Sequence, residues 1–163
     1  MRRRSPVTCS GMSEEPDMLA LERQVCFALA IATRSVLAIY RPILEPLGLT
    51  HPQYLVMLAL WGRSPMSVKE LGSLLQLDSP TLSPLLKRLE SAGLITRRRR
   101  SDDERVLDVE LTVAGRAMRA RAEEVPPAVI GRLGMDVSRL EELHGALTEV
   151  IAAARAAGAQ LPS

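Results

Sequence analysis

The stretch that decides the fold runs from Ser67 to Thr112 and reads SVKELGSLLQLDSPTLSPLLKRLESAGLITRRRRSDDERVLDVELT. Its first four residues form a capping box, in which Ser67 and Glu70 each accept the other's backbone N–H, and leucines follow at helical spacing. A polar break at 76–79 separates this helix from a second one over 80–92, which Gly93 ends. Residues 94–96 are expected to begin one strand, and residues 106–111, which alternate with period two, are expected to form a second. Two short helices followed by a hairpin predict a winged helix-turn-helix.

Helical patterns precede this stretch. Asp17 can cap a helix that runs to about Tyr40, where Pro42 and Pro46 interrupt the apolar spacing. Thr50 then caps a second helix, whose apolar residues face nearly every direction and predict that it is buried.

Helical patterns also follow it. Thr112 caps a helix to about Val125, Pro126 and Pro127 end or kink that helix, and Asp136 starts the last one. The first helix and the last two have apolar faces but no sheet of their own to cover, which predicts burial against a second copy. The predicted fold class is mainly α with a small β wing: a winged helix-turn-helix with N- and C-terminal dimerisation helices.

Composition excludes several classes of protein. Of the 163 residues, 47% are hydrophobic and 25% charged, which is typical of a globular chain. Aromatic residues make up 2%, too few for a protein that stacks single-stranded bases, and two cysteines exclude a disulfide scaffold or a cysteine-rich zinc fold. His51 and His144 have no accompanying metal-ligand cluster, and we expect surface or packing roles for them. We therefore expect no metal, no cofactor and no enzyme.

The N-terminus predicts a cytoplasmic protein. Three arginines open the chain, but no apolar signal region follows them, and no uninterrupted apolar stretch approaches the roughly 18 residues of a membrane helix. We expect no membrane association, a flexible tail over 1–16 and a single domain over 17–163. Met12 is an alternative start to Met1.

Positive charge is concentrated in one window. The window from Ser79 to Ser101 contains six positive residues and one acidic residue, Glu90. Its net charge is therefore +5, whereas the net charge of the whole chain is +2. An isolated run of four arginines is more often a solvated surface, but here it lies on the wing of a helix-turn-helix, which favours binding of double-stranded DNA. The domain is then expected to divide into a DNA-binding region over 50–112 and dimerisation helices over 17–49 and 113–163.

The geometry of the motif assigns a role to each group of residues. The N-terminal part of the second helix meets base edges, its next turn holds phosphates, and the arginine-rich wing enters the minor groove. The corresponding residues are Ser79, Pro80, Thr81, Ser83 and Pro84 for bases, Lys87 and Arg88 for phosphates, and Arg97, Arg98, Arg99 and Arg100 for the wing.

The wing also resembles that of the MarR family of dimeric repressors. Asp103-Glu104-Arg105, running on to Leu111-Thr112, is similar to the family's D-x-R-x-x-x-x-x-L-T signature. The resemblance implies that Arg105 enters the minor groove and that Asp103 orients it.

A narrower resemblance is to the organic hydroperoxide resistance repressors within that family. It rests on the segments 24–29, 52–55 and 77–88, and covers the chain from about residue 22 to residue 113. It implies that Cys26 is oxidised by an organic hydroperoxide to a sulfenic acid, which a thiol then caps, and that the repressor leaves its operator. It also implies that Tyr40 hydrogen-bonds the sensor thiolate across the dimer interface.

Two cysteine schemes and several rival functions remain open. Cys9 lies in the tail, which favours capping of Cys26 by a low-molecular-weight thiol over a second protein cysteine. Ala30 stands where relatives often have a second tyrosine, which leaves a less stabilised thiolate or a roomier pocket. Three other functions remain open: a MarR-type repressor released by a small aromatic or phenolic ligand, a thiol enzyme that reduces peroxides, and an interaction module that binds no DNA. For Cys26 itself the alternative role is that of a small buried hydrophobic side chain. The operator, the regulated genes and the inducing peroxide cannot be inferred.

Overall fold

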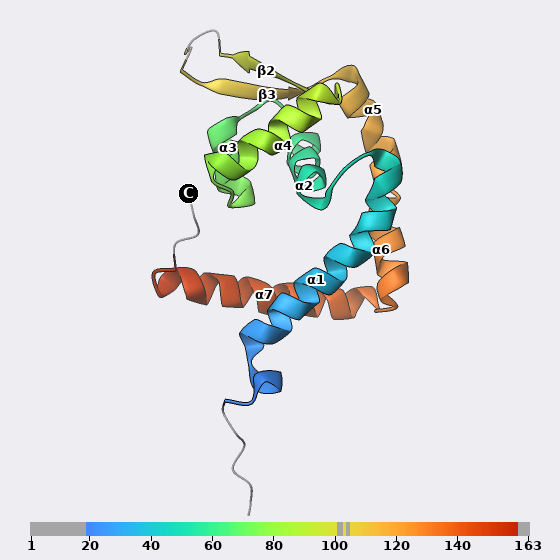
Figure 1. The fold of residues 1–163 in the computed structure, drawn as a ribbon, viewed down its shortest axis with the longest axis vertical. Helices are drawn as coiled ribbons and strands as arrows, with labels where there is room; N and C mark the ends of the chain where they lie inside the picture. The colour runs from blue at the N-terminus through green and yellow to red at the C-terminus, as the bar shows by residue number, and fades with distance from the viewer. Residues whose placement is uncertain (1–18, 101–102, 104, 160–163) are drawn as a thin grey trace, which may run out of the picture. The chain divides into compact units, whose positions relative to one another are not determined.

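The computed structural model describes residues 19–100, 103 and 105–159, so Cys9, Asp17 and the predicted tail lie outside the described residues. The described chain divides into two compact units that meet inside α1, between Ser35 and Val36. Figure 1 shows the elements, which in chain order are η1 (Leu21–Arg23), α1 (Val25–Leu44), η2 (Glu45–Leu47), α2 (His51–Gly62), β1 (Met66–Ser67), α3 (Val68–Leu75), α4 (Ser79–Ser91), β2 (Ile95–Arg99), β3 (Leu107–Leu111), α5 (Val113–Ala122), α6 (Val125–Leu133) and α7 (Val137–Ala156).

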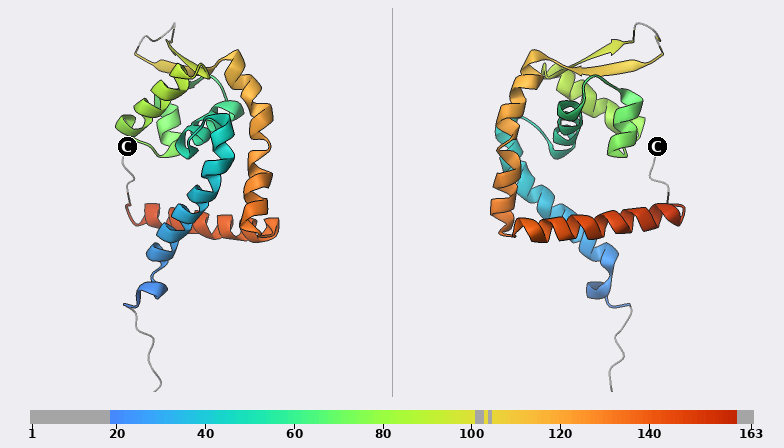
Figure 2. Two further views of the ribbon diagram at one scale, coloured as in Figure 1. Left: turned by 45° about the vertical axis from the view of Figure 1, so that its right-hand side comes forward. Right: turned by 180° about the vertical axis from the view of Figure 1, so that it is seen from behind.

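The wing is a three-stranded antiparallel sheet in the order β1–β3–β2. β2 pairs with β3 from Ile95 opposite Leu111 to Arg99 opposite Leu107, and Figure 2 shows this hairpin beside α4 from two further directions. Mostly helical structure with this small sheet confirms the predicted fold class. The sequence did not reveal β1, because a two-residue strand is too short to show alternation.

Side-chain caps begin the helices where the sequence predicted them. Thr50 donates its backbone N–H to Gln53 Oε1 at 2.8 Å before α2. Ser67 does the same with Glu70 Oε2 at 2.8 Å before α3, and Glu70 N–H is donated to Ser67 Oγ at 3.2 Å. Gly93 follows α4 with φ 71°, a left-handed conformation that only glycine adopts without strain. These local signals fix the helix-turn-helix and the start of the wing.

The core joins α2, α3, α4 and the sheet. Its fully buried side chains are Leu44, Val56, Met57, Leu60, Leu71, Leu82, Leu86, Leu89, Ile95 and Val109. α2 supplies three of these but leaves Leu58 43% exposed, so the prediction that α2 is buried on nearly all sides is wrong on that side. Leu82, Leu86 and Leu89 bury one face of α4 in this core, so the opposite face of α4 is exposed to solvent.

Two predicted helix ends are wrong, and proline explains both. α1 continues through Pro42 to Leu44, since a proline inside a helix removes one hydrogen bond without always ending the helix. Pro126 and Pro127 do not merely end a helix but lie in the first turn of α6. Backbone N–H groups in a first turn have no partner within the helix, so proline costs little there.

α7 is exposed along its length. It has no buried residue, and Leu143, Val150 and Ile151 are each about half exposed. Such a face is what a helix that packs against a second chain presents before the second chain is added.

Residues Val25–Leu47 are long and apolar enough to cross a membrane by length and composition, with mean hydropathy 1.4. The prediction concerned uninterrupted apolar stretches, and Arg34 and Arg41 interrupt this one; it did not anticipate that the segment as a whole is this apolar. One such helix is weak support for a membrane protein, since a dimerisation helix has the same composition.

Candidate functional site

α4 presents the predicted DNA-contacting residues on its exposed face. Asp78 caps the helix by accepting the Thr81 N–H at 2.9 Å, and this bonding to Thr81 lowers the pKa of Asp78. The carboxylate therefore stays ionised at the helix N-terminus, where negative charge is favourable. All seven residues predicted on this helix are exposed: Ser79, Pro80, Thr81, Ser83, Pro84, Lys87 and Arg88.

Arg97, at the base of the wing, is bound to the C-terminal part of α4. Its Nε and Nη2 donate to Glu90 Oε2 at 2.9 and 2.6 Å, and its backbone N–H is donated to Glu90 Oε1 at 3.2 Å. These hydrogen bonds from Arg97 lower the pKa of Glu90. Glu90 is thus a structural partner of the wing. In the sequence it was only the one acidic residue among the basic residues of this window.

Arg100 is bound within the wing itself. Its Nε and Nη2 donate to the two carboxylate oxygens of Asp108 at 2.9 and 2.7 Å, and these bonds lower the pKa of Asp108. Arg98 and Arg99 are exposed, and Asp108 lies opposite Arg98 in the ladder. Carboxylates therefore bind at least two of the four arginines, Arg97 and Arg100.

Asp103 and Arg105 are also exposed, near the tip of the wing. Asp103 Oδ1 accepts the backbone N–H of Arg105 at 3.0 Å. This hydrogen bond orients the backbone of Arg105, so orientation of its guanidinium by Asp103 stays a prediction.

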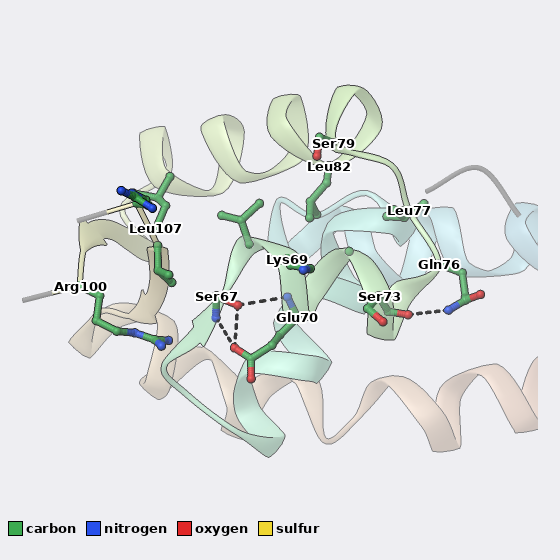
Figure 3. Close-up of a pocket in the computed structure, with 14 residues that line it drawn as sticks. Ser67, Lys69, Glu70, Ser73, Gln76, Leu77, Ser79, Leu82, Arg100 and Leu107 are labelled. Carbon is green, nitrogen blue, oxygen red and sulfur yellow. Dashed lines mark hydrogen bonds between the residues drawn. The ribbon is translucent and has the colours of Figure 1, made fainter. Parts of the chain in front are cut away.

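A groove of about 880 Å³ lies between α3, the start of α4 and the wing (Figure 3). Basic side chains on it come from Lys69, Arg100 and Arg105, and hydroxyls come from Ser73 and Ser79. The Ser67–Glu70 capping box forms part of its wall. Basic and acidic side chains therefore both line the groove, and Asp108 already holds one of the basic ones, Arg100.

Cys26 is the second residue of α1 and is an exposed free cysteine. It belongs to the first compact unit, whereas Tyr40 belongs to the second. Ala30 is exposed in the first unit. The exposure of Cys26 means that it is not a buried core side chain in a single chain.

Tyr40 lies in an aromatic cluster that the sequence did not predict. Its ring meets His51 edge-on with centroids 4.8 Å apart, and Tyr54 links it to Trp61, whose Nε1 donates to the Gly115 carbonyl at 2.9 Å. Burial raises the pKa of Tyr40, which keeps its hydroxyl protonated and able to donate a hydrogen bond. His51 thus has the packing role expected of it, and the described residues contain no group that could hold a metal ion.

We expect the stability of the protein to depend on pH through His51. Burial lowers the pKa of His51 below its usual 6.5, so the unfolded chain takes up this proton more readily than the folded one. The free energy of unfolding should be constant with respect to His51 above pH 6.5 and should fall as the pH drops below that value. Urea unfolding across this range checks it, and H51Q should show a weaker dependence. Equal pH dependence in wild type and H51Q would show that His51 is not the responsible group.

Comparison with known proteins adds the family. The MarR family matches residues 49–107, which span α2, both helices of the helix-turn-helix and most of the wing. The chain is 40% identical to the organic hydroperoxide resistance transcriptional regulator of Bacillus subtilis, with 83% of this chain and 92% of that regulator covered.

Two solved structures have the same fold. A probable transcriptional regulator from Pseudomonas aeruginosa is 30% identical with a TM-score of 0.70, over 80% of this chain and 98% of that one. Reduced AbfR bound to DNA, a protein of Staphylococcus epidermidis, is 36% identical with a TM-score of 0.64, over 80% and 94% of the two chains. The chain belongs to the MarR family of DNA-binding transcriptional regulators.

Proposed function

We propose that this protein is a homodimeric repressor that leaves its operator when an organic hydroperoxide oxidises Cys26. It is a transcriptional regulator rather than an enzyme, as its family and relatives are. The observation that carries the proposal is the exposed Cys26 in a chain 40% identical to an organic hydroperoxide resistance regulator. Its place of action is the cytoplasm, where its DNA lies.

The DNA-bound form uses the exposed face of α4 and the wing. Ser79, Pro80, Thr81 and Ser83 lie at the helix end that meets base edges, and Lys87 and Arg88 lie where phosphates pass. Exposed basic side chains of the wing, Arg98, Arg99 and Arg105, supply charge for the minor groove and its flanking phosphates.

The sensing reaction transfers one oxygen atom to sulfur. The Cys26 thiolate attacks the hydroperoxide, the O–O bond breaks, and a proton completes the departing alcohol, so the sulfur becomes a sulfenic acid and the peroxide is reduced. A low-molecular-weight thiol then condenses with the sulfenic acid, forming a mixed disulfide and releasing water. Exposure of Cys26 supports both steps, because both reagents must reach the sulfur.

Tyr40 is the proposed hydrogen-bond donor to the thiolate, and the donor comes from the partner subunit. An α-helix rises about 1.5 Å per residue, so two residues as far apart in one helix as 26 and 40 cannot hydrogen-bond each other. Half-exposed apolar side chains along α7 support a dimer. Light scattering should therefore give the mass of two chains.

We expect organic hydroperoxide to release the protein from DNA. A duplex that binds tightly can be isolated from a random-sequence library, and binding to it measured before and after addition of cumene hydroperoxide and a small thiol. Release should coincide with a mass increase on the peptide that contains Cys26. Unchanged DNA binding after complete oxidation of Cys26 would contradict the proposal.

A second candidate function has a specific observation in its favour. A cavity of about 300 Å³ lies between α2, α5 and α6, lined by Tyr54, Trp61, Arg119 and Pro126. Aromatic rings beside an arginine suit a small phenolic carboxylate. In the same DNA-binding measurement, release by salicylate but not by hydroperoxide would select this function instead.

A further inference from the structure

We propose that Glu90 and Asp108 are positioning residues that fix the wing, each by holding one arginine of the four-arginine run away from DNA. Arg97 and Arg100 then serve the structure of the wing, and Arg98 serves the DNA. This inference goes beyond the proposed sensing function, because it concerns how the DNA-binding surface is built.

The Glu90–Arg97 ion pair joins the recognition helix to the sheet. Glu90 is near the end of α4, and Arg97 is the middle residue of β2, paired in the ladder with the fully buried Val109. One carboxylate accepts three hydrogen bonds from Arg97, two from the guanidinium and one from the backbone. Because the backbone of β2 is one of the donors, the pair fixes the distance between α4 and the strand and does more than neutralise charge.

The Asp108–Arg100 ion pair continues this attachment toward the tip. Asp108 lies opposite Arg98 in the ladder, yet its two oxygens accept from Arg100, one step along the diagonal. A two-bond contact between a guanidinium and a carboxylate is directional as well as strong. Glu90 therefore attaches the wing to α4, and Asp108 fixes Arg100 within the wing.

These pairs determine which arginines can bind phosphate. If Arg97 turned to DNA it would leave the Glu90 carboxylate uncompensated beside a polyanion, whereas Arg98 can reach a phosphate without that cost. Each phosphate neutralised steepens the fall of log K with log salt concentration by about 0.9. The slope therefore counts how many basic side chains contact the backbone.

The first test measures that slope on the selected duplex, by fluorescence anisotropy over a range of salt concentrations. R98A should make the slope shallower by about 0.9, and R97A should leave it unchanged. E90Q should weaken specific binding by roughly tenfold, comparable to a mismatched base pair in the site. E110Q is the matched control, since it removes the same charge from β3, where Glu110 faces Thr96, and should leave specific binding intact.

The second test exchanges the two charges. E90R alone places two cations together and should weaken specific binding. The double variant E90R/R97E should bind more tightly than E90R, because the ion pair re-forms with opposite polarity, but less tightly than the wild type, because an arginine at position 90 cannot accept the backbone N–H of residue 97. Thermal unfolding of each variant shows that it is folded. The proposal is wrong if R97A and R98A change the slope equally, if E90Q binds like the wild type, or if the double variant binds more weakly than E90R.

Discussion

Gly115→Ala is expected to lower the free energy of unfolding by about 3 kcal/mol, at the upper end of what overpacking costs. A Cβ at Gly115 would lie 2.0 Å from the carbonyl oxygen of Leu94 and 3.2 Å from Cδ2 of Leu111. Real carbon and oxygen atoms do not approach so closely, so α5 or the start of the wing would have to move. Urea unfolding measures the loss.

The surrounding hydrogen bonds explain why the backbone cannot relax cheaply. The Leu94 carbonyl accepts the Thr112 N–H at 3.1 Å, and Thr112 Oγ1 in turn accepts the Gly115 N–H at 2.9 Å and donates to the Gly93 carbonyl at 2.7 Å. Trp61 holds the Gly115 carbonyl from the other side. A shift large enough to admit a methyl group would break several of these bonds at once.

Gly62→Ala is the control for this substitution. Gly62 ends α2, and a Cβ there would meet nothing within 4 Å. Alanine is the better helix former, so the change should be neutral or stabilising by up to about 1 kcal/mol. If G115A were as stable as G62A, the close approach of α5 to Leu94 would be wrong.

Signals from neighbouring residues predicted most of this fold. The Ser67–Glu70 capping box, the stop at Gly93 and the alternation of 106–111 each depend on residues within a few positions. The structure confirms the box and the stop, and it has a strand over 107–111 of the alternating stretch. These patterns work because helix caps and strand pleats are set by local backbone geometry.

Contacts between elements could not be predicted in this way. Arg97 and Arg98 are neighbours in one run of arginines, and the roles that separate them depend on the approach of Glu90 from α4 and on the β3 residue that each one faces. Gly115 looks like an ordinary glycine in a helix until the Leu94 carbonyl is placed against it. His51 next to Tyr40 likewise depends on how α1 and α2 pack. Which arginines bind DNA is therefore a question of tertiary structure.

Cys26→Ser is expected to abolish release from DNA by organic hydroperoxide. Serine keeps the size of the side chain but can form neither a sulfenic acid nor a disulfide, so hydroperoxide and thiol should leave the DNA affinity of C26S unchanged. The wild type should lose affinity roughly 5- to 150-fold, the usual range for coupling between two sites. Anisotropy on the selected duplex, with and without cumene hydroperoxide and a small thiol, measures both.

The physical reason is that a bulky cap favours a different arrangement of the dimer. The two recognition helices of the dimer must reach half-sites about 34–36 Å apart. A small change in the dimer interface alters the spacing of these helices, so that both can no longer bind their half-sites at once. A mixed disulfide at Cys26 adds volume to α1, whose apolar face we propose to be part of that interface. The loss of DNA affinity equals the free energy by which the cap stabilises the released arrangement of the dimer relative to the DNA-bound arrangement.

Cys9→Ser separates the two cysteine schemes and is the matched control. If a small thiol caps Cys26, C9S should be released as the wild type is, and its Cys26 peptide should carry the mass of that thiol. If Cys9 were the resolving partner, C9S would accumulate sulfenic or sulfinic acid at Cys26 instead. Release of C26S by hydroperoxide at the wild-type dose would disprove sensing by Cys26 while leaving the DNA-binding assignment intact, because R98A tests that assignment without any oxidant.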